Sequence, residues 1–281
     1  MNMTLTFYIM DRLSQAGFYE GMTRILVTGA TGKTGTHVTR QLRAKGIEVL
    51  EANRSRGFDW SDESTWDTFL SDVDVAYIAH PDITVPEAED DLRRFGKAAV
   101  ARGVRRLVLL SARPEIKGEQ AITTSEAEWT IVGPGWFNEN FTLAGFAEAV
   151  RRGRLALPLG DVTEPFVAAA DIAAVAVAAL TEDGHRGRKY KLTGPRALSF
   201  AEAAAAITAA GRPVTYVPLS PGEFIEEFTA DGGSRADAEH HITIAAMSMG
   251  GEFTAVSPDV EQVLGRPAID FADWAKAQDW S

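Results

Sequence analysis

Short apolar runs alternate with longer segments of helical periodicity from Arg24 onward. The runs 25–27, 75–79 and 107–110 are apolar without alternation, which is typical of strands buried on both faces of a sheet. The pattern predicts strands at 24–29, 47–55, 73–80, 105–112, 128–135 and 187–195. It predicts helices at 35–46, 62–72, 86–103, 120–127 and 166–180.

Strands that alternate with helices of this length form βαβ units. We therefore predict an α/β fold built on a doubly wound parallel sheet. Beyond Pro195 the pattern changes to helical segments with short connections, which predicts a smaller, mostly helical lobe. The expected organisation is an extension of unclear role at 1–22, the sheet domain at 23–195, and the helical lobe at 196–281, to which 154–164 also contributes.

Charge and composition narrow the function classes. The chain is acidic, with a net charge of −11 and a pI of about 5.0, so we expect neither nucleic acid nor a membrane as a partner. It has no cysteine, and its five histidines lack ligand spacing, so we expect no metal site. Residues 1–21 lack the features of a signal peptide. These features favour a cytoplasmic monomer or homodimer.

Three glycines separate the first predicted strand from the helix that follows it. Gly29, Gly32 and Gly35 are spaced three apart. At such a turn glycine permits the required dihedral angles and lets a diphosphate approach the bare amides of a helix N-terminus. The sequence therefore predicts nucleotide binding by the whole loop, Gly29, Ala30, Thr31, Gly32, Lys33, Thr34 and Gly35.

The loop "VTGATGKTG" resembles the phosphate loop of extended and atypical short-chain dehydrogenases. Four later stretches, "FDWSDESTW", "SEAEWTIVGPGWFNENF", "PFVAAADIAAVAVAAL" and "KLTGPRALSFAEAA", are similar to the NmrA-like group in order and spacing. The resemblance implies an NAD(P)-binding Rossmann domain followed by a substrate lobe.

The end of the second predicted strand bears on the choice of cofactor. Arg54 stands where NmrA-like proteins that use NADP carry an arginine for the 2′-phosphate, so the resemblance favours NADP(H) over NAD(H). Glu51 lies three residues earlier, and we expect it not to reach the ribose. The alternative for Arg54 is a solvated loop residue. Other cofactor contacts implied by the resemblance are Asp59, Trp60, Ala79, His80, Pro81, Ser111, Ala112 and Pro134.

The sequence offers no obvious catalytic acid. None of its tyrosines is followed four residues later by lysine, and the corresponding region contains Glu119 and Gln120 instead. The catalytic residue is therefore unknown. An acceptor such as an iminium ion or a quinone needs little help from an acid during hydride transfer.

A substrate site is predicted directly after the fifth strand. Trp136 and Phe137 supply an apolar wall, while Asn138 and Asn140 supply amide groups; the alternative is that both aromatic rings belong to the core. The leading hypothesis is an NADPH-dependent reductase of an electron-poor small molecule: a quinone, azo compound, iminium or activated carbonyl. The alternative is a non-catalytic NADP(H)-binding redox sensor that acts through a protein partner. An isomerase is a third, weaker reading.

Overall fold

A computed structural model describes residues 24–112, 118–143, 145–249 and 254–280. The expected extension at 1–22 lies outside these residues. The main sheet has the strand order β2-β1-β3-β4-β5-β8. The pairings of neighbouring strands from β2 to β5 are all parallel. Its strands are β1 (Ile25–Thr28), β2 (Val49–Ala52), β3 (Val75–Ile78), β4 (Arg106–Leu110), β5 (Glu128–Pro134) and β8 (Arg188–Leu192).

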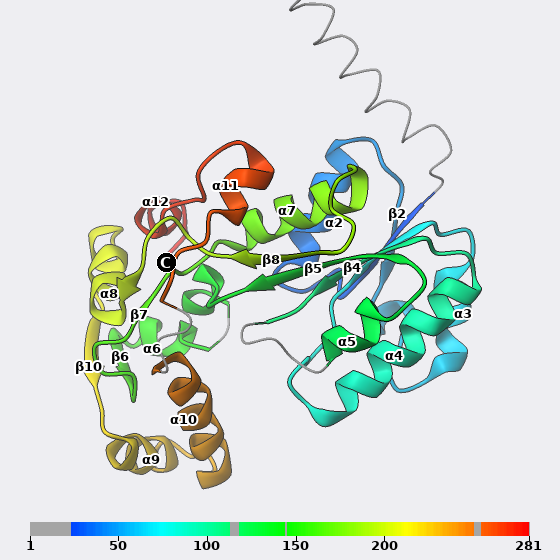
Figure 1. Ribbon diagram of the computed structural model, residues 1–281. Helices are drawn as coiled ribbons and strands as arrows, with labels where there is room; N and C mark the ends of the chain where they lie inside the picture. Colours follow the sequence, from blue (N-terminus) through cyan, green and yellow to red (C-terminus); the bar gives the residue numbers. More distant parts are fainter. Residues whose placement is uncertain (1–23, 113–117, 144, 250–253, 281) are drawn as a thin grey trace, which may run out of the picture. The chain divides into compact units, whose positions relative to one another are not determined.

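Helices cover both faces of this sheet, as Figure 1 shows. One face carries α2 (Gly35–Ala44) and α7 (Ala169–Thr181), and the other carries α3 (Trp66–Leu70), α4 (Pro86–Ala101) and α5 (Gly118–Thr123). Pro86 starts α4 because its missing N–H costs nothing at the first helical position. The predicted doubly wound α/β fold is confirmed.

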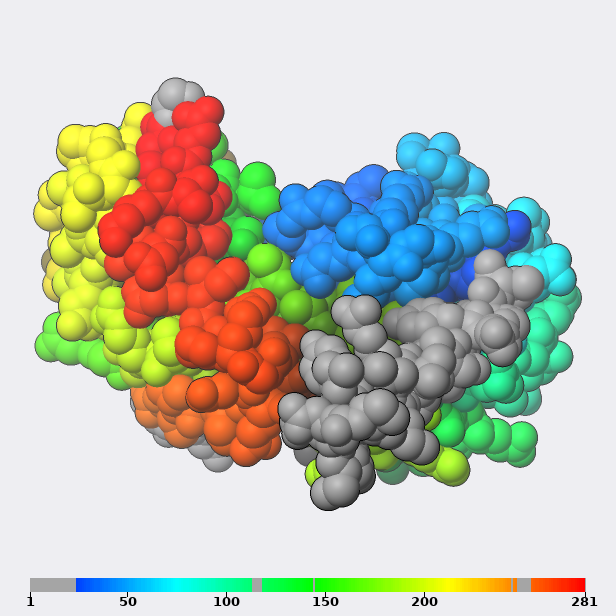
Figure 2. Space-filling view, turned by 90° about the horizontal axis from the view of Figure 1, so that it is seen from above, coloured from blue at the N-terminus to red at the C-terminus, as the bar shows by residue number. Residues whose placement is uncertain are grey.

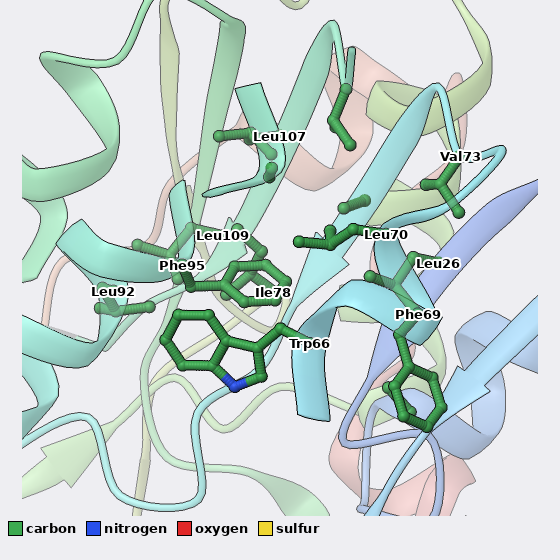
Figure 3. Packing of buried hydrophobic residues seen from close by; sticks show 14 of the residues in the cluster. Leu26, Trp66, Phe69, Leu70, Val73, Ile78, Leu92, Phe95, Leu107 and Leu109 are labelled. Atoms are coloured by element: carbon green, nitrogen blue, oxygen red, sulfur yellow. The ribbon is translucent and has the colours of Figure 1, made fainter. Parts of the chain in front are cut away.

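An aromatic core lies beneath α3 and α4 (Figure 3). Trp66 packs edge-on against Phe95, with ring centroids 5.4 Å apart, and Ile78 and Leu109 lie beside them. All four side chains are buried. Burying side chains of this size contributes about 1.5–3 kcal/mol each, so this face fixes the positions of the strand ends above it.

The chain divides into two compact units, and neither is continuous in sequence. The first comprises residues 1–133 and 172–190, and the second comprises residues 134–171 and 191–281. This division differs from the expected boundary at Pro195, because 134–171 groups with the C-terminal segment. The segment 154–164 lies within this second unit.

The second unit contains strands that the pattern did not predict. β6 (Arg154–Leu157) pairs with β10 (Thr215–Pro218), and β7 (Thr163–Glu164) pairs with β9 (Leu198–Ser199). These strands are two to four residues long, too short for a period to be visible. Its helices are α6 (Ala147–Arg151), α8 (Phe200–Ala209), α9 (Pro221–Ala230), α10 (Arg235–Met249), α11 (Asp259–Leu264) and α12 (Phe271–Lys276).

An aromatic cluster forms the core of this second unit. Phe141, Phe166, Phe200 and Phe271 are almost fully buried and contact one another at centroid distances of 5.2–6.4 Å. Figure 2 shows α12, in red, beside α8, in yellow, and the two helices pack together. Within the described residues, no helix combines the length and apolar character needed to cross a membrane.

Candidate functional site

The glycine turn after β1 is built so that two of its positions require glycine. Gly29 has a φ of +61°, and a Cβ there would lie 3.1 Å from the Cβ of Ala79. Gly35 opens α2, and a Cβ there would lie 2.1 Å from the carbonyl oxygen of Gly29. Real Cβ atoms do not approach a backbone oxygen so closely, so the strand and the helix can meet only over glycine.

The middle of the turn is open to solvent. Thr31 and Gly32 are exposed, Lys33 is half-buried, and Ala30 is buried beneath them. The turn is closed by a hydrogen bond from the Gly32 amide to the Gly29 carbonyl at 2.9 Å. Amides in the first turn of a helix have no intrahelical acceptor and attract anions. The bare main chain here therefore fits the diphosphate of a dinucleotide.

Two buried hydroxyl groups hold the turn in place from below. Tyr77 on β3 donates to the Thr34 hydroxyl at 2.9 Å, and burial raises the pKa of Tyr77, so this phenol stays protonated. The Ala79 amide donates to the Thr28 hydroxyl at 2.8 Å. The ends of β1 and β3 are thus tied together, and Thr34 has a structural role in addition to its predicted place in the loop.

The arginines after β2 differ in what they contact. Glu51 is held by Arg43 at 2.6 Å and by Arg56 at 3.5 Å. Arg54 starts a single 3-10 turn, η1 (Arg54–Arg56), and its side chain is exposed. Among the described residues no ion pair engages Arg54. Its guanidinium is therefore available to an anionic ligand, whereas the carboxylate of Glu51 is already paired with two arginines.

Asp59 and Trp60 lie beyond this turn and face different environments. Asp59 is exposed, and hydrogen bonds from Ser61 lower the pKa of its carboxyl group. The Trp60 ring is only 9% exposed and packs on the core rings of Phe58 and Phe95. Any contact of Trp60 with an adenine would thus come from its main chain.

His80 is anchored inside the first unit. Its Nδ1 lies 2.7 Å from the Asp82 carbonyl oxygen and its Nε2 lies 3.2 Å from the Asp91 carboxylate. Its ring also packs against Trp60 at 5.0 Å. These contacts fix the His80 ring at the end of β3. Pro81, which follows it, is exposed.

A polar cluster of two buried side chains and one exposed lysine lies at the carboxyl end of β4. Ser111 donates its hydroxyl to Glu119 Oε1 at 2.5 Å, and Lys189 Nζ lies 3.1 Å from Glu119 Oε2. Ser111 and Glu119 are 5% and 3% exposed. Ala112, the next predicted contact, is half-buried. Glu119 and Lys189 are absent from the predicted site.

Different signals were available for those two residues. Glu119 stands where the usual tyrosine is missing, so a charged replacement was visible in the sequence. Lys189 is 70 residues further along and reaches Glu119 because β8 joins the same sheet as β4. No local pattern could have pointed to it.

The predicted substrate residues lie in the second unit. Pro134, which was predicted as a cofactor contact, ends β5 in the same unit and is buried. Trp136 is half-buried and stacks on Phe146 at 5.3 Å, and Phe137 is half-buried beside Val167. The Trp136 ring thus packs partly on the core of the second unit, whereas Phe137 meets Val167 through a backbone bridge.

Asn138 is the most unusual of these residues. It opens a 3-10 turn, η3 (Asn138–Phe141), and its side chain is fully buried. Neither its amide oxygen nor its amide nitrogen has a hydrogen-bond partner among the described residues. An unsatisfied buried amide costs about 1–3 kcal/mol, so this group fits a site that a polar ligand or a water completes. Asn140 is half-buried in the same turn.

No group of three or more His, Asp or Glu side chains in the described ranges is arranged to hold a metal ion.

The predicted site residues are divided between the two units. The first unit contains the phosphate loop, Arg54, Asp59, Trp60, Ala79, His80, Pro81, Ser111 and Ala112. The second unit contains Pro134, Trp136, Phe137, Asn138 and Asn140.

The chain is similar to several known proteins. Residues 25–127 match the model of the NAD dependent epimerase/dehydratase family. The NAD(P)H azoreductase of Xenophilus azovorans is 33% identical, over 90% of this chain and 97% of its own length. The NADPH-dependent quinone oxidoreductase of Escherichia coli, solved with NADPH, is 25% identical with a TM-score of 0.73, over 89% of this chain and 98% of its own.

The transcriptional regulator NmrA, solved with NAD, has a TM-score of 0.68 over 92% of this chain and 95% of its own. At 15% identity this likeness shows the fold alone. The azoreductase relative spans nearly the whole chain at an identity that establishes kinship. Together with the glycine turn and the sheet order, it shows that the chain belongs to the NmrA-like family of atypical short-chain dehydrogenases/reductases.

Proposed function

We propose that this protein is an NADPH-dependent reductase that transfers hydride to an electron-poor small molecule. Its family makes it an NAD(P)H-dependent oxidoreductase; the preference for NADPH and the class of acceptor are the finer parts of the proposal. The observation that carries it is the turn at Gly29 and Gly35, where a Cβ would strike backbone. With its diphosphate bound at this turn, a reduced dinucleotide would supply the hydride from its nicotinamide ring.

The arginines after β2 support NADPH over NADH. A ribose 2′-OH is usually held by an acidic side chain at this strand end, and a 2′-phosphate by an arginine. Glu51 is occupied by Arg43 and Arg56, while Arg54 is exposed and has no ion pair in the described part of the chain. A dianionic phosphate is the better match for such a group.

The acceptor class follows from the missing acid. A simple ketone needs a proton as hydride arrives, and the tyrosine that usually supplies it is absent. Quinones, azo compounds, iminium ions and activated carbonyls spread or neutralise the incoming charge themselves. The names of the azoreductase and quinone oxidoreductase relatives point to the same class. For the substrate we propose contacts to Trp136, Phe137, Asn138 and Asn140.

Cofactor preference is tested by titrating the protein with NADPH and NADH. Replacing Arg54 by alanine should weaken NADPH about tenfold to a hundredfold, the value of one charge-assisted contact, and leave NADH unchanged. Arg56→Ala is the matched control because Arg56 pairs with Glu51. Equal affinities for both cofactors in the wild type, unaffected by Arg54→Ala, would contradict the assignment.

Turnover is tested with a panel of quinones, azo dyes and cyclic iminium salts, followed by loss of the reduced-nicotinamide absorbance. Oxidation of NADPH with any of them supports the reductase. Tight NADPH binding without turnover across the panel, together with a protein partner whose binding depends on cofactor redox state, would instead support a redox sensor.

A further inference from the structure

Three polar side chains at the end of β4 contact one another in sequence, from a hydroxyl to a carboxylate to an ammonium group. Ser111, Glu119 and Lys189 come from β4's end, the first turn of α5, and β8. Ser111 is also fixed through its amide, which donates to the Val132 carbonyl at 2.9 Å. Because hydrogen bonds hold both the main chain and the side chain of Ser111, its hydroxyl group is fixed in one orientation.

The distances indicate how the protons are arranged. The Ser111 hydroxyl donates to Glu119 Oε1 at 2.5 Å. Lys189 Nζ lies 3.1 Å from the other carboxylate oxygen, Oε2, so Oε1 is left to accept from Ser111. The Ser111 proton is therefore committed to Glu119, and the lone pairs of the Ser111 oxygen point away from it.

We propose that Glu119 and Lys189 polarise Ser111 so that its oxygen stabilises positive charge on the nicotinamide ring. This inference rests on the proposed function, in which a dinucleotide lies along the carboxyl ends of the strands. Hydride transfer breaks a C–H bond of the reduced ring, the electron pair leaves with the hydrogen to the acceptor, and the ring is left cationic. An oxygen of raised negative charge beside it lowers the energy of that step.

The same arrangement narrows the acceptor. Because its proton is shared with Glu119, Ser111 is not placed to protonate a substrate anion. Acceptors that need no acid from the protein at the hydride step, such as iminium ions and quinones, match this polarity. Glu119 and Lys189 act through Ser111 and are positioning residues.

The proposal is tested by the affinities of the oxidised and reduced cofactors, measured by calorimetry without any substrate. Ser111→Ala and Glu119→Gln should each raise the ratio of Kd for NADP⁺ to Kd for NADPH about tenfold, the value of one charge-assisted interaction. The double variant should match the single variants, because each single change already abolishes the same polarised oxygen, by removing either the hydroxyl or the carboxylate that polarises it.

Glu128→Gln is the matched control, because it breaks an ion pair to Arg106 of similar length, 3.0 Å, at the amino end of β5. It should leave the ratio unchanged, and thermal melts identify any variant that fails to fold. An unchanged ratio in both Ser111→Ala and Glu119→Gln overturns this inference and leaves the proposed function standing. A wild-type protein that binds neither cofactor overturns both.

Discussion

At the scale of single residues, two positions of the site have unusual surroundings. The position of Gly35 admits no Cβ, because the Gly29 carbonyl already occupies that space. Asn138 shows the opposite situation, a polar group buried without a partner in the described residues. The glycine fits its place and the buried amide costs stability, so each leads to a test that separates stability from function.

Gly35→Ala should destabilise the fold and weaken NADPH binding at least tenfold, because the added methyl forces α2 away from the turn. Overpacking of this kind costs about 1–3 kcal/mol. Gly222→Ala is the control, because a Cβ there meets nothing within 4 Å. Thermal melts and cofactor titration measure the two effects, and normal NADPH affinity in folded Gly35→Ala would contradict the role of the turn.

Asn138→Leu should make the protein more stable and a poorer catalyst. Leucine removes the unsatisfied amide, which should raise the free energy of unfolding by about 1–2 kcal/mol. It also removes the polar contact that we propose for the substrate, so kcat/KM should fall about tenfold or more. Urea unfolding and steady-state kinetics check the pair of effects. A variant that loses stability and keeps full activity would remove Asn138 from the proposed site.

At the scale of elements, what the sequence predicted depended on how local each signal is. The strand, turn and helix around Gly29 and Gly35 were predictable because their geometry is set by adjacent residues. The pairing of β6 with β10 was not, because short strands about 60 residues apart show no local period. The same holds for Lys189, whose contact with Glu119 depends on the order of strands in the sheet.

The start of α12 combines a helix cap with an ion pair. Asp270 accepts from the Ala272 amide at 2.8 Å and from Arg196 Nε at 2.7 Å. The hydrogen bond from Arg196 is the largest cause that lowers the pKa of Asp270 below its ordinary value of 3.8. The carboxylate therefore stabilises the fold above that value, and the contribution is lost as pH falls through the folded-state pKa.

Asp270→Asn should consequently be destabilising at neutral pH, by no more than about 1 kcal/mol because the pair is partly exposed. The difference from wild type should shrink toward zero below pH 3.8, the ordinary value. Urea unfolding across this range provides the measurement. Asp273→Asn, in the same helix and 72% exposed, should show little difference at any pH. A wild-type difference that stays constant with pH would contradict the charge argument.

At the scale of the whole molecule, the chain passes between its two units at residues 133–134, 171–172 and 190–191. A cut at Pro195 would therefore leave 134–171 without the C-terminal segment that belongs to the same unit. Phe141 and Phe166 would lose Phe200 and Phe271, which they contact in the full chain.

A fragment spanning residues 24–195 keeps the described residues of the first unit but should bind a hydrophobic dye strongly. The cause is the exposed aromatic rings of the dismantled core of the second unit. Dye fluorescence, with the full chain as the control, makes the measurement. A fragment that binds no more dye than the full chain would support Pro195 as a domain boundary.

Glu51 is an acidic residue near the end of β2, and it forms ion pairs with Arg43 and Arg56. In the proposed NADPH-dependent reductase, removing those two arginines would free the Glu51 carboxylate but would not place it at the ribose, because Glu51 lies three residues before Arg54. A change of preference toward the non-phosphorylated coenzyme therefore requires a new acidic side chain closer to Arg54.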